Sequence, residues 1–261
     1  MRKAIVSGAN GFVGSAVVKE LISQGYEVYA LVRENHYDQV PINEMVRIVP
    51  FSLENIEALG EVIPINEYEA FYHFAWNGSA GVDRADTALQ LKNAQWTVEC
   101  LQMAKRLGCK RFVPAGSIME HETIAAVYTQ GNRPGAGYIY GSGKVAAHMM
   151  CMSMAVKEGI NLVWPKITNA YGPSERSPRL VNSTIRKCIA GEDPQFTAGT
   201  QNYDFVYIDD VARAFRLIGE KGKPFHHYLI GSGKAKALKE FLLEMRAAIA
   251  PDLEFKFGDI P

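Results

Sequence analysis

The sequence predicts an α/β protein with a doubly wound parallel sheet and a smaller C-terminal domain. Three observations lead to this prediction. In the first half of the chain, short apolar runs alternate with longer amphipathic stretches, which is the pattern of βαβ units. Three glycines, Gly8, Gly11 and Gly14, directly follow the first apolar run. Beyond Gly172 the chain becomes richer in Pro, Ser and Gly and is broken by turns, which marks a second domain.

The apolar runs define the expected strands. Six are predicted, at residues 3–8, 26–32, 46–51, 69–75, 110–116 and 160–167. Helices are predicted where apolar residues recur at helical spacing, over residues 11–23, 53–61, 84–107 and 140–157. Because strand–helix–strand crossovers are right-handed, these helices have to cover both faces of the sheet.

The two domains are expected to alternate along the chain. Residues 204–221 return to a strand followed by a helix that begins with Asp209 and Asp210, and acidic residues favour a helix N-terminus. We therefore assign 1–171 and 204–221 to the domain of the parallel sheet, and 172–203 and 222–261 to the smaller domain; the motifs described below identify the first as dinucleotide-binding and the second as substrate-binding.

Composition and charge narrow the class of function. The 28 basic and 28 acidic residues cancel, so the net charge does not favour nucleic acid or a membrane as partner. The chain reaches a glycine at its eighth residue, too early for the apolar segment of a signal peptide, and no apolar run has the length of a membrane span. The six histidines lack metal-ligand spacing and the four cysteines form no Cys-x-x-Cys pair. We expect a cytoplasmic enzyme without a metal.

The glycine-rich stretch IVSGANGFVG predicts a cofactor site. A dinucleotide's pyrophosphate approaches backbone N–H groups at a helix N-terminus, where a Cβ would block it. The alternative is a structural turn of three glycines, but the strand before and the helix after favour a cofactor. The expected cofactor-binding residues of this loop are Gly8, Asn10, Gly11, Phe12, Val13 and Gly14.

Arg33, at the end of the second predicted strand, bears on which cofactor binds. An acidic residue at this place would hold the ribose hydroxyls of NAD, whereas a guanidinium can bind the 2′-phosphate of NADP with paired hydrogen bonds. Arg33 therefore favours NADP. Because Glu34 follows it directly, a solvated strand-end arginine and NAD as cofactor remain the alternative.

The stretch YIYGSGK carries Tyr140 and Lys144, four residues apart on a predicted helix. Side chains at this spacing can meet. Chance alone would supply roughly 0.7 such pairs in a chain of this composition, so the spacing is meaningful only in context. The pair is a candidate for proton transfer, or it is two unrelated side chains on one helix.

Six motifs in order resemble a known family. They are GANGFVG, the HFA at 73–75, Ser117, the YGSGK at 140–144, the NAYGP at 169–173 and the DFVYIDDVA at 204–212. Together they resemble the extended short-chain dehydrogenase/reductases, and more narrowly the NAD-dependent epimerase/dehydratase family that acts on nucleotide sugars. The resemblance implies a Rossmann sheet that binds NAD or NADP, and a smaller C-terminal domain that binds the nucleotide sugar.

The resemblance also implies roles for individual residues. Ser117, Tyr140 and Lys144 correspond to a catalytic trio. Tyr140 transfers the proton while hydride moves between sugar and nicotinamide; Lys144 lowers the pKa of the phenol and hydrogen-bonds the nicotinamide ribose; Ser117 donates to the substrate oxygen. Ala75 and His73 line the cofactor, although a core role for His73 is equally compatible with the sequence. Asn93 corresponds to a position that braces the active-site loops.

Departures from the family pattern narrow the expected reaction. The family's dehydratases carry an Asp-Glu pair after the active-site hydroxyl, whereas here Ile118 and Met119 follow Ser117 and Glu120 comes too late. Dehydration is thus disfavoured, which leaves carbonyl reduction or epimerisation through a transient ketone. Tyr203 replaces a common arginine and resembles reductases that make deoxysugars, so we favour a 4-ketoreductase over an epimerase. Asn169, Arg179 and Tyr203 are the expected substrate-binding residues, with Arg176 and Lys187 as further basic candidates.

Two further expectations follow from the resemblance. Members dimerise by packing two long helices, here 84–107 and 140–157, and the methionines in MMCMSMAV offer an apolar surface, so we expect a homodimer. Members also continue beyond FGDIP, so we expect a further segment to complete the substrate domain. A non-catalytic NADP-binding regulator is the distant alternative; such a protein would be expected to have lost part of the trio, which is intact here.

Overall fold

The structure is a computed structural model that describes residues 1–258, so the last three residues of the predicted substrate-binding domain lie outside the described part. The chain divides into two compact units. The first contains residues 1–167 and 208–230, and the second contains 168–207 and the chain from Gly231 onward. Over residues 1–258, no helix combines the length and the apolar character needed to cross a membrane.

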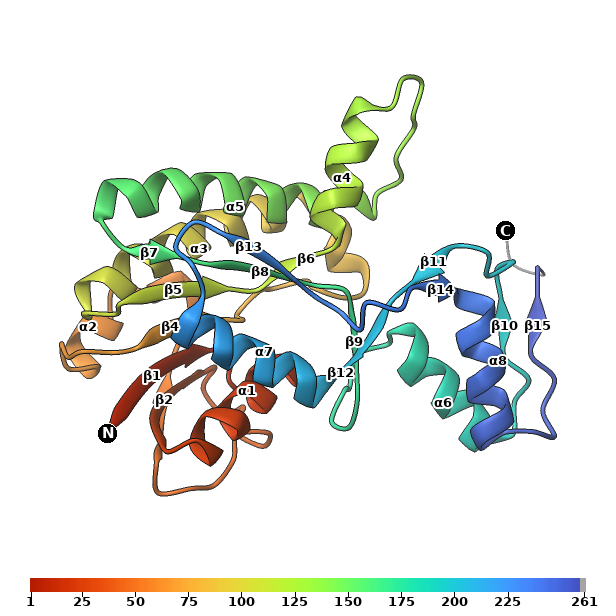
Figure 1. The fold of residues 1–261 in the computed structure, drawn as a ribbon, viewed down its shortest axis with the longest axis horizontal. Coiled ribbons are helices and arrows are strands. Elements are labelled where there is room, and N and C mark those ends of the chain that lie inside the picture. The colour runs from red at the N-terminus through yellow and green to blue at the C-terminus, as the bar shows by residue number, and fades with distance from the viewer. Residues whose placement is uncertain (259–261) are drawn as a thin grey trace. The chain divides into compact units, whose positions relative to one another are not determined.

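The first unit contains a six-stranded sheet in the order β3-β2-β1-β4-β5-β7, and all its neighbouring strands are parallel (Figure 1). The strands are β1 (Arg2–Ser7), β2 (Tyr26–Val32), β3 (Val46–Pro50), β4 (Ala70–His73), β5 (Arg111–Pro114) and β7 (Asn161–Leu162). The order reverses direction between β1 and β4, which in this architecture places ligands at the carboxyl ends of the central strands. The predicted doubly wound fold is confirmed.

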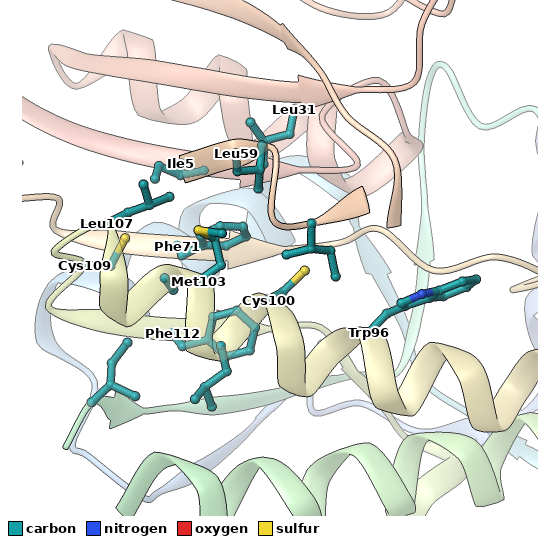
Figure 2. Close-up of a cluster of buried hydrophobic side chains, with 14 of the residues drawn as sticks. Ile5, Leu31, Leu59, Phe71, Trp96, Cys100, Met103, Leu107, Cys109 and Phe112 are labelled. Atoms are coloured by element: carbon teal, nitrogen blue, oxygen red, sulfur yellow. The ribbon is translucent and has the colours of Figure 1, made fainter. Parts of the chain in front are cut away.

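Helices cover both faces of this sheet, as predicted. Helices α1 (Phe12–Ser23) and α7 (Ile208–Lys221) pack together on one face, and α3 (Thr87–Arg106) and α5 (Tyr138–Glu158) pack together on the other. The main core lies under α3. Figure 2 shows Phe71 and Phe112 of the sheet facing Cys100 and Met103 of this helix, all of them almost fully buried. Burial of this apolar surface is the main force that holds the helix on the sheet. The predicted stretch 53–61 forms the 3-10 helix η1 (Leu53–Asn55) and the short helix α2 (Leu59–Val62).

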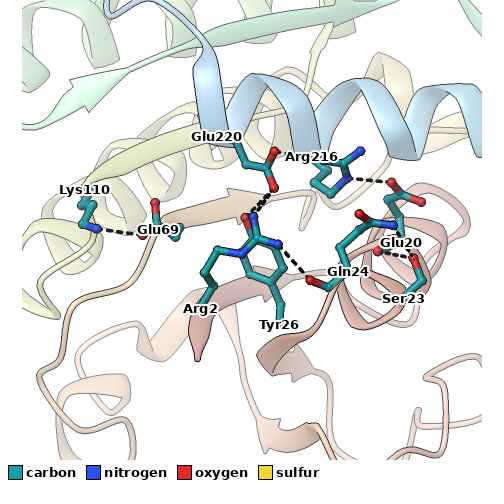
Figure 3. Close-up of polar contacts among 9 residues, drawn as sticks. All are labelled: Arg2, Glu20, Ser23, Gln24, Tyr26, Glu69, Lys110, Arg216 and Glu220. Atoms are coloured by element: carbon teal, nitrogen blue, oxygen red, sulfur yellow. Dashed lines mark hydrogen bonds and ion pairs between the residues drawn. The ribbon is translucent and has the colours of Figure 1, made fainter.

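Polar contacts tie α1 and α7 together near the start of β1 and β2. Figure 3 shows Glu220 of α7 accepting hydrogen bonds from both Arg2 and Tyr26, with Arg216 reaching Glu20 of α1. Burial opposes ionisation of Glu220, but hydrogen bonds from Tyr26 and Arg216 and the charges of both arginines hold its pKa below the usual range. The network joins the amino ends of the strands and leaves their carboxyl ends to the glycine loop.

The segment predicted as one sixth strand is two strands. Residues Asn161–Leu162 form β7, whereas β8 (Trp164–Ile167) pairs with β6 (Gly116–Ser117) and β13 (His227–Ile230) in a separate three-stranded parallel sheet. Between them, the Val163 N–H still donates to Phe112 of the first sheet, while the Trp164 N–H donates to His226. The backbone thus changes from hydrogen bonding with the first sheet to hydrogen bonding with the second sheet between Val163 and Trp164.

The domain bounds therefore differ from the prediction in one substantial way. Residues 222–230 were assigned to the substrate-binding domain, but β13 belongs to the first unit because it pairs along its whole length with β8. Smaller differences occur at 168–171 and 204–207, which fall in the second unit because β9 (Asn169–Tyr171) pairs with β12 (Phe205–Tyr207).

Two helices were not predicted. Helix α4 (Met119–Tyr128) directly follows Ser117, and α6 (Leu180–Ala190) lies in the stretch expected to consist of turns. The start of α6 follows Pro178 closely, and the helix ends at Gly191, which has a positive φ of 72°. Proline before a helix and glycine after it are ordinary boundary signals, and the surrounding Pro and Ser residues obscured them.

The second unit has its own small core. Helices α6 and α8 (Leu238–Ile249) accompany the short strand pairs β10 (Gln195–Phe196) with β15 (Lys256–Phe257), and β11 (Asn202–Tyr203) with β14 (Lys236–Ala237). Its buried cluster consists of Phe196, Leu238, Leu242, Ala250 and Phe255. A core of this kind allows the unit to form a compact body with few strands.

Candidate active site

The glycine loop joins β1 to α1, as the sequence predicted. Gly8 has a positive φ of 65°, and a Cβ at this position would lie 2.7 Å from the Ala75 nitrogen. A Cβ at Gly14 would lie 2.1 Å from the Gly8 carbonyl oxygen. Both distances are below any real contact, so these two glycines are required by the packing of the protein itself.

Gly11 differs from the other two glycines. Its φ is −81°, which any residue can adopt, and an added Cβ would meet only the Gly8 carbonyl oxygen, at 3.2 Å. Among the described residues, no side chain caps α1, and its first turn has no acidic residue. An exposed, uncapped helix N-terminus without a nearby carboxylate suits a phosphate. The loop therefore fits the pyrophosphate of a dinucleotide, and the backbone N–H groups at Asn10, Phe12 and Val13 are placed where they could hold it.

The end of β4 packs against this loop. The Ala75 N–H points to the Ser7 hydroxyl oxygen, 3.4 Å away, and the Ala75 backbone lies against Gly8. His73 is fully enclosed, with Nδ1 2.8 Å from Ser7 Oγ and Nε2 3.4 Å from Thr97 Oγ1. Burial, assisted by the charge of Lys144, lowers the pKa of His73 to about 3. His73 is thus a neutral core residue that joins β1, β4 and α3.

Ser117 lies at the end of β6, next to the first turn of α4. Its hydroxyl oxygen accepts a hydrogen bond from the Met119 N–H at 3.2 Å, and its own N–H donates to Glu120 Oε1 at 2.9 Å. The side chain is half-buried. A serine hydroxyl that already accepts from the backbone has its proton left to donate.

Tyr140 and Lys144 lie one turn apart on α5, and the intervening glycines explain how this helix fits. A Cβ at Gly141 would lie 2.1 Å from the Thr123 hydroxyl of α4, and a Cβ at Gly143 would lie 3.0 Å from the Gln90 carbonyl of α3. The two glycines let α5 approach α4 and α3 closely at the same level. The motif YGSGK thus combines two candidate chemical groups with the residues that allow their helix to pack.

Lys144 is enclosed, with only 6% of its surface exposed. Its Nζ donates to the Ala115 carbonyl at 2.9 Å and lies 3.5 Å from the centre of the Trp76 ring. Burial lowers the pKa of Lys144 to about 7, and the negative charge of Glu120 opposes that shift. The amine can therefore exist in both charge states near neutral pH.

The Tyr140 ring is held from two sides. The Arg84 guanidinium lies 4.4 Å from its centre, and the Trp76 ring meets it edge to face at 6.0 Å. Gln90 fixes Trp76 by accepting a hydrogen bond from its indole N–H at 2.8 Å. Both contacts engage the ring rather than the hydroxyl, so they orient the phenol without depending on its proton.

Trp76, Arg84 and Gln90 were not found by sequence reasoning. The useful signal was position, because Trp76 directly follows the HFA at the end of β4, where ligands gather in such folds. Asn93 braces the same loop by exchanging two hydrogen bonds with the Asn77 backbone, at 2.8 and 2.9 Å. This geometry suits the bracing role inferred for it.

Arg33 and Ser52 lie where the adenosine half of a dinucleotide is expected. Arg33 follows the last residue of β2 and is exposed. Ser52 caps the 3-10 helix η1 by accepting from the Glu54 N–H at 3.2 Å. Within the described part of the chain, His, Cys, Asp and Glu side chains form no group of three that could hold a metal ion.

The expected substrate-binding residues all belong to the second unit. Asn169 donates from its side chain to the Asp204 carbonyl at 3.2 Å, and Tyr203 packs its ring against Phe205 with 5.6 Å between centres. Arg179 precedes α6 and makes a loose ion pair with Glu175, at 3.9 Å. Arg176 and Lys187 are exposed. The predicted trio and these residues thus come from different units.

Comparison with known proteins agrees with this architecture. CDP-abequose synthase of Salmonella muenchen is 27% identical over 255 residues, covering 92% of this chain and 78% of that protein. The dTDP-6-deoxy-L-talose 4-dehydrogenase (NAD(+)) of Aggregatibacter actinomycetemcomitans is also 27% identical, over 95% of this chain and 92% of its own.

A solved structure shares the fold along the whole chain. The UDP-N-acetylglucosamine 4-epimerase of Methanobrevibacter ruminantium M1, in complex with UDP-N-acetylmuramic acid, superposes with a TM-score of 0.82 at 19% identity, covering 99% of this chain and 87% of that one. Residues 4–231 match the family described as NAD dependent epimerase/dehydratase. The chain therefore belongs to the NAD dependent epimerase/dehydratase family, as an enzyme of the short-chain dehydrogenase/reductase type on a Rossmann sheet.

Proposed function

We propose that this enzyme reduces the keto group of a nucleotide-activated deoxysugar, with Tyr140 as the general acid. The names of the two relatives described above refer to nucleotide-linked abequose and 6-deoxytalose, which supports a deoxysugar substrate. When bound, the nicotinamide cofactor supplies a hydride to the carbonyl carbon. Tyr140 donates its proton to the carbonyl oxygen, and the Ser117 hydroxyl hydrogen-bonds the same oxygen as charge develops there.

Lys144 supports the proton transfer through its charge. As an ammonium ion it stabilises the phenolate left on Tyr140 and is the natural donor to the nicotinamide ribose. Its contact with the Trp76 ring favours the charged form. Gly8, Gly11, Gly14 and Ala75 line the part of the site that would hold the dinucleotide.

The burial and hydrogen bonding of Glu120 are the observation on which the choice of reduction or epimerisation over dehydration rests. Removal of water from a sugar needs carboxyl groups beside the active-site hydroxyl, yet Ile118 and Met119 directly follow Ser117. Glu120 is 1% exposed, and both its oxygens are occupied by neighbouring groups. Because this carboxylate cannot exchange a proton with a sugar, reduction or epimerisation is favoured over dehydration.

A substrate screen tests the proposed reaction. Nucleotide-activated 4-keto-6-deoxy sugars are offered with NADPH and, separately, with NADH, and loss of reduced-nicotinamide absorbance is followed. The expected result is stoichiometric oxidation of the cofactor with one keto-sugar. Absence of oxidation with all of them would refute the reductase.

An epimerase working through a transient 4-keto sugar is the second candidate. The fold similarity to the UDP-N-acetylglucosamine 4-epimerase is compatible with it. The two reactions are separated by cofactor consumption, because an epimerase interconverts two sugars without a net change in the nicotinamide. Product analysis by chromatography of UDP-, dTDP- and CDP-sugars incubated with catalytic NAD would reveal it.

Arg33 is proposed to favour NADP over NAD. Replacing Arg33 with Asp is expected to lower the NADP/NAD preference, measured as the ratio of kcat/KM values, on the order of 10- to 100-fold, because hydrogen bonds to charged groups contribute about 1.5–3 kcal/mol. The control is the same charge change at Lys19, which is exposed on α1. An unchanged ratio in R33D would show that the 2′-phosphate is not recognised by Arg33.

We also propose a homodimer formed through α3 and α5. Met149, Met152 and Val156 lie on one side of α5 at helical spacing and are 60%, 36% and 69% exposed, which is unusual for apolar side chains on one stripe. Replacing Met149 and Met152 with Lys is expected to yield a monomer in size-exclusion chromatography with light scattering. Val127→Lys on α4, an equally exposed apolar site, is the control and keeps the dimer. A monomeric wild-type protein would contradict the proposal.

A further inference from the structure

Glu120 is a buried carboxylate that takes no direct part in the proposed reaction. Oε1 accepts hydrogen bonds from the Ser117 N–H at 2.9 Å and from the Trp164 indole N–H at 3.0 Å. Oε2 lies 2.9 Å from His148 Nδ1 and 3.5 Å from Lys166 Nζ. One side chain of α4 is thus bonded to β6, β8 and α5.

The surrounding backbone is shaped to admit this carboxylate. A Cβ at Gly116 would lie 2.6 Å from Glu120 Oε1 and 2.4 Å from Trp164 Nε1. Only glycine therefore allows both groups to reach the strand immediately before Ser117. The His148 ring stacks on Trp164 with 4.3 Å between centres, which restrains the plane of the ring beside Glu120.

The carboxylate is ionised despite its burial. Burial raises the pKa of Glu120, but the bonds from His148, Ser117 and Trp164 and the charge of Lys166 outweigh it and hold the pKa below the usual value. The titratable groups that face this cluster are His148 and Lys144 from α5, Lys166 from β8, His121 from α4, and His227 from β13, which acts on His121. Burial and the neighbouring Lys166 lower the pKa of His121, so this ring contributes little positive charge.

Glu120 links the two parts of the catalytic trio. Ser117 lies on the strand it binds, and His148 lies one helical turn after Lys144 on α5. We propose that Glu120 is a positioning residue that fixes Ser117 relative to the Tyr140–Lys144 helix, and that its buried negative charge favours the ammonium form of Lys144. Only the turnover measurements below rest on the proposed reductase function; the cofactor-binding measurement does not.

The first experiment measures cofactor affinity against pH in the wild-type protein and in Glu120→Gln. The amide preserves the shape of the side chain and removes its charge. Because Glu120 raises the pKa of Lys144, its loss is expected to move the pH at which NADPH affinity declines to lower values, by up to about one unit. Glu122→Gln, the exposed carboxylate two residues on, is the control and shows the wild-type curve. A wild-type curve in Glu120→Gln would overturn the electrostatic role.

The second experiment measures turnover of the keto-sugar that the screen identifies. Glu120→Ala is expected to lower kcat on the order of 100-fold with little change in KM, because displacement of reacting groups by about 1 Å has effects of that size. Glu120→Gln is expected to recover most of the loss at a pH low enough to keep Lys144 charged. A kcat of Glu120→Ala equal to that of the wild type would overturn the positioning role.

The proposal can still be tested if the Glu120→Ala variant does not fold or if no substrate is found. If circular dichroism shows that Glu120→Ala does not fold, His148→Gln takes its place, because it breaks the link to α5 at a partly exposed residue. A reduced kcat with wild-type cofactor affinity would support the proposal. An unchanged kcat would overturn it. If no keto-sugar is reduced, the proposed function fails, whereas the pH dependence of cofactor affinity still decides the charge relation between Glu120 and Lys144.

Discussion

Tyr140→Phe is expected to lower turnover by about 100- to 10,000-fold, the usual contribution of a positioned general acid. Arg84 and Trp76 hold the ring and not the hydroxyl, at 4.4 and 6.0 Å between centres, so the phenylalanine ring should occupy the same place. Cofactor affinity and thermal stability are therefore expected to stay close to wild type. The loss would thus report the missing proton and not a disturbed fold.

The measurement is single-turnover oxidation of reduced cofactor with saturating keto-sugar, alongside a fluorescence titration of cofactor binding. Tyr138→Phe is the matched control, because Tyr138 lies in the first turn of the same helix and is only half-buried; it should turn over normally. Near-normal activity of Tyr140→Phe would remove the proton-transfer role from this residue.

Gly14→Ala is expected to lose stability of the fold, whereas Gly11→Ala is expected to lose affinity for the cofactor. The added Cβ at Gly14 would lie 2.1 Å from the Gly8 carbonyl oxygen, so the loop has to move, at a cost of about 1–3 kcal/mol or more. The added Cβ at Gly11 would meet only the same oxygen at 3.2 Å. Its cost to folding is expected to be under about 1 kcal/mol, the usual difference between Gly and Ala at a helix N-cap.

Thermal unfolding with and without cofactor separates these two effects. Gly14→Ala should unfold at a lower temperature in the absence of any ligand. Gly11→Ala should unfold close to the wild-type temperature without ligand, but should gain less stability when NADPH is added, because tighter binding to the folded state gives more stabilisation. If Gly11→Ala gained as much as the wild type, the phosphate would have to bind elsewhere.

The sequence predicted the elements whose signals are local. The strands from Arg2 to Pro114 and the helices α1, α3, α5 and α7 follow from the period of apolar residues, which each segment carries by itself. The break between β7 and β8 and the place of β13 were missed. Both depend on which distant strand offers free backbone groups, and no local period contains that information.

The same distinction applies to the site. Gly8, Gly11 and Gly14, and likewise Tyr140 and Lys144, are close in the chain, so their spacing, read with the elements predicted around them, suggested them. Trp76 and Arg84 reach Tyr140 from more than fifty residues away in sequence. Glu120 comes too late in the sequence to match a dehydratase pair, and nothing near it along the chain predicts that Trp164 and Lys166 surround it.

The sequence by itself therefore determined the class of fold, the glycine loop and the spacing of the catalytic candidates, because each rests on residues within a few turns of one another. Only the tertiary structure decided which other groups surround the catalytic candidates and set their pKa values. Burial lowers the pKa of Lys144, and a carboxylate from another helix opposes that change. Such effects depend on the exclusion of water and on distance through space, which arise only when the chain has folded.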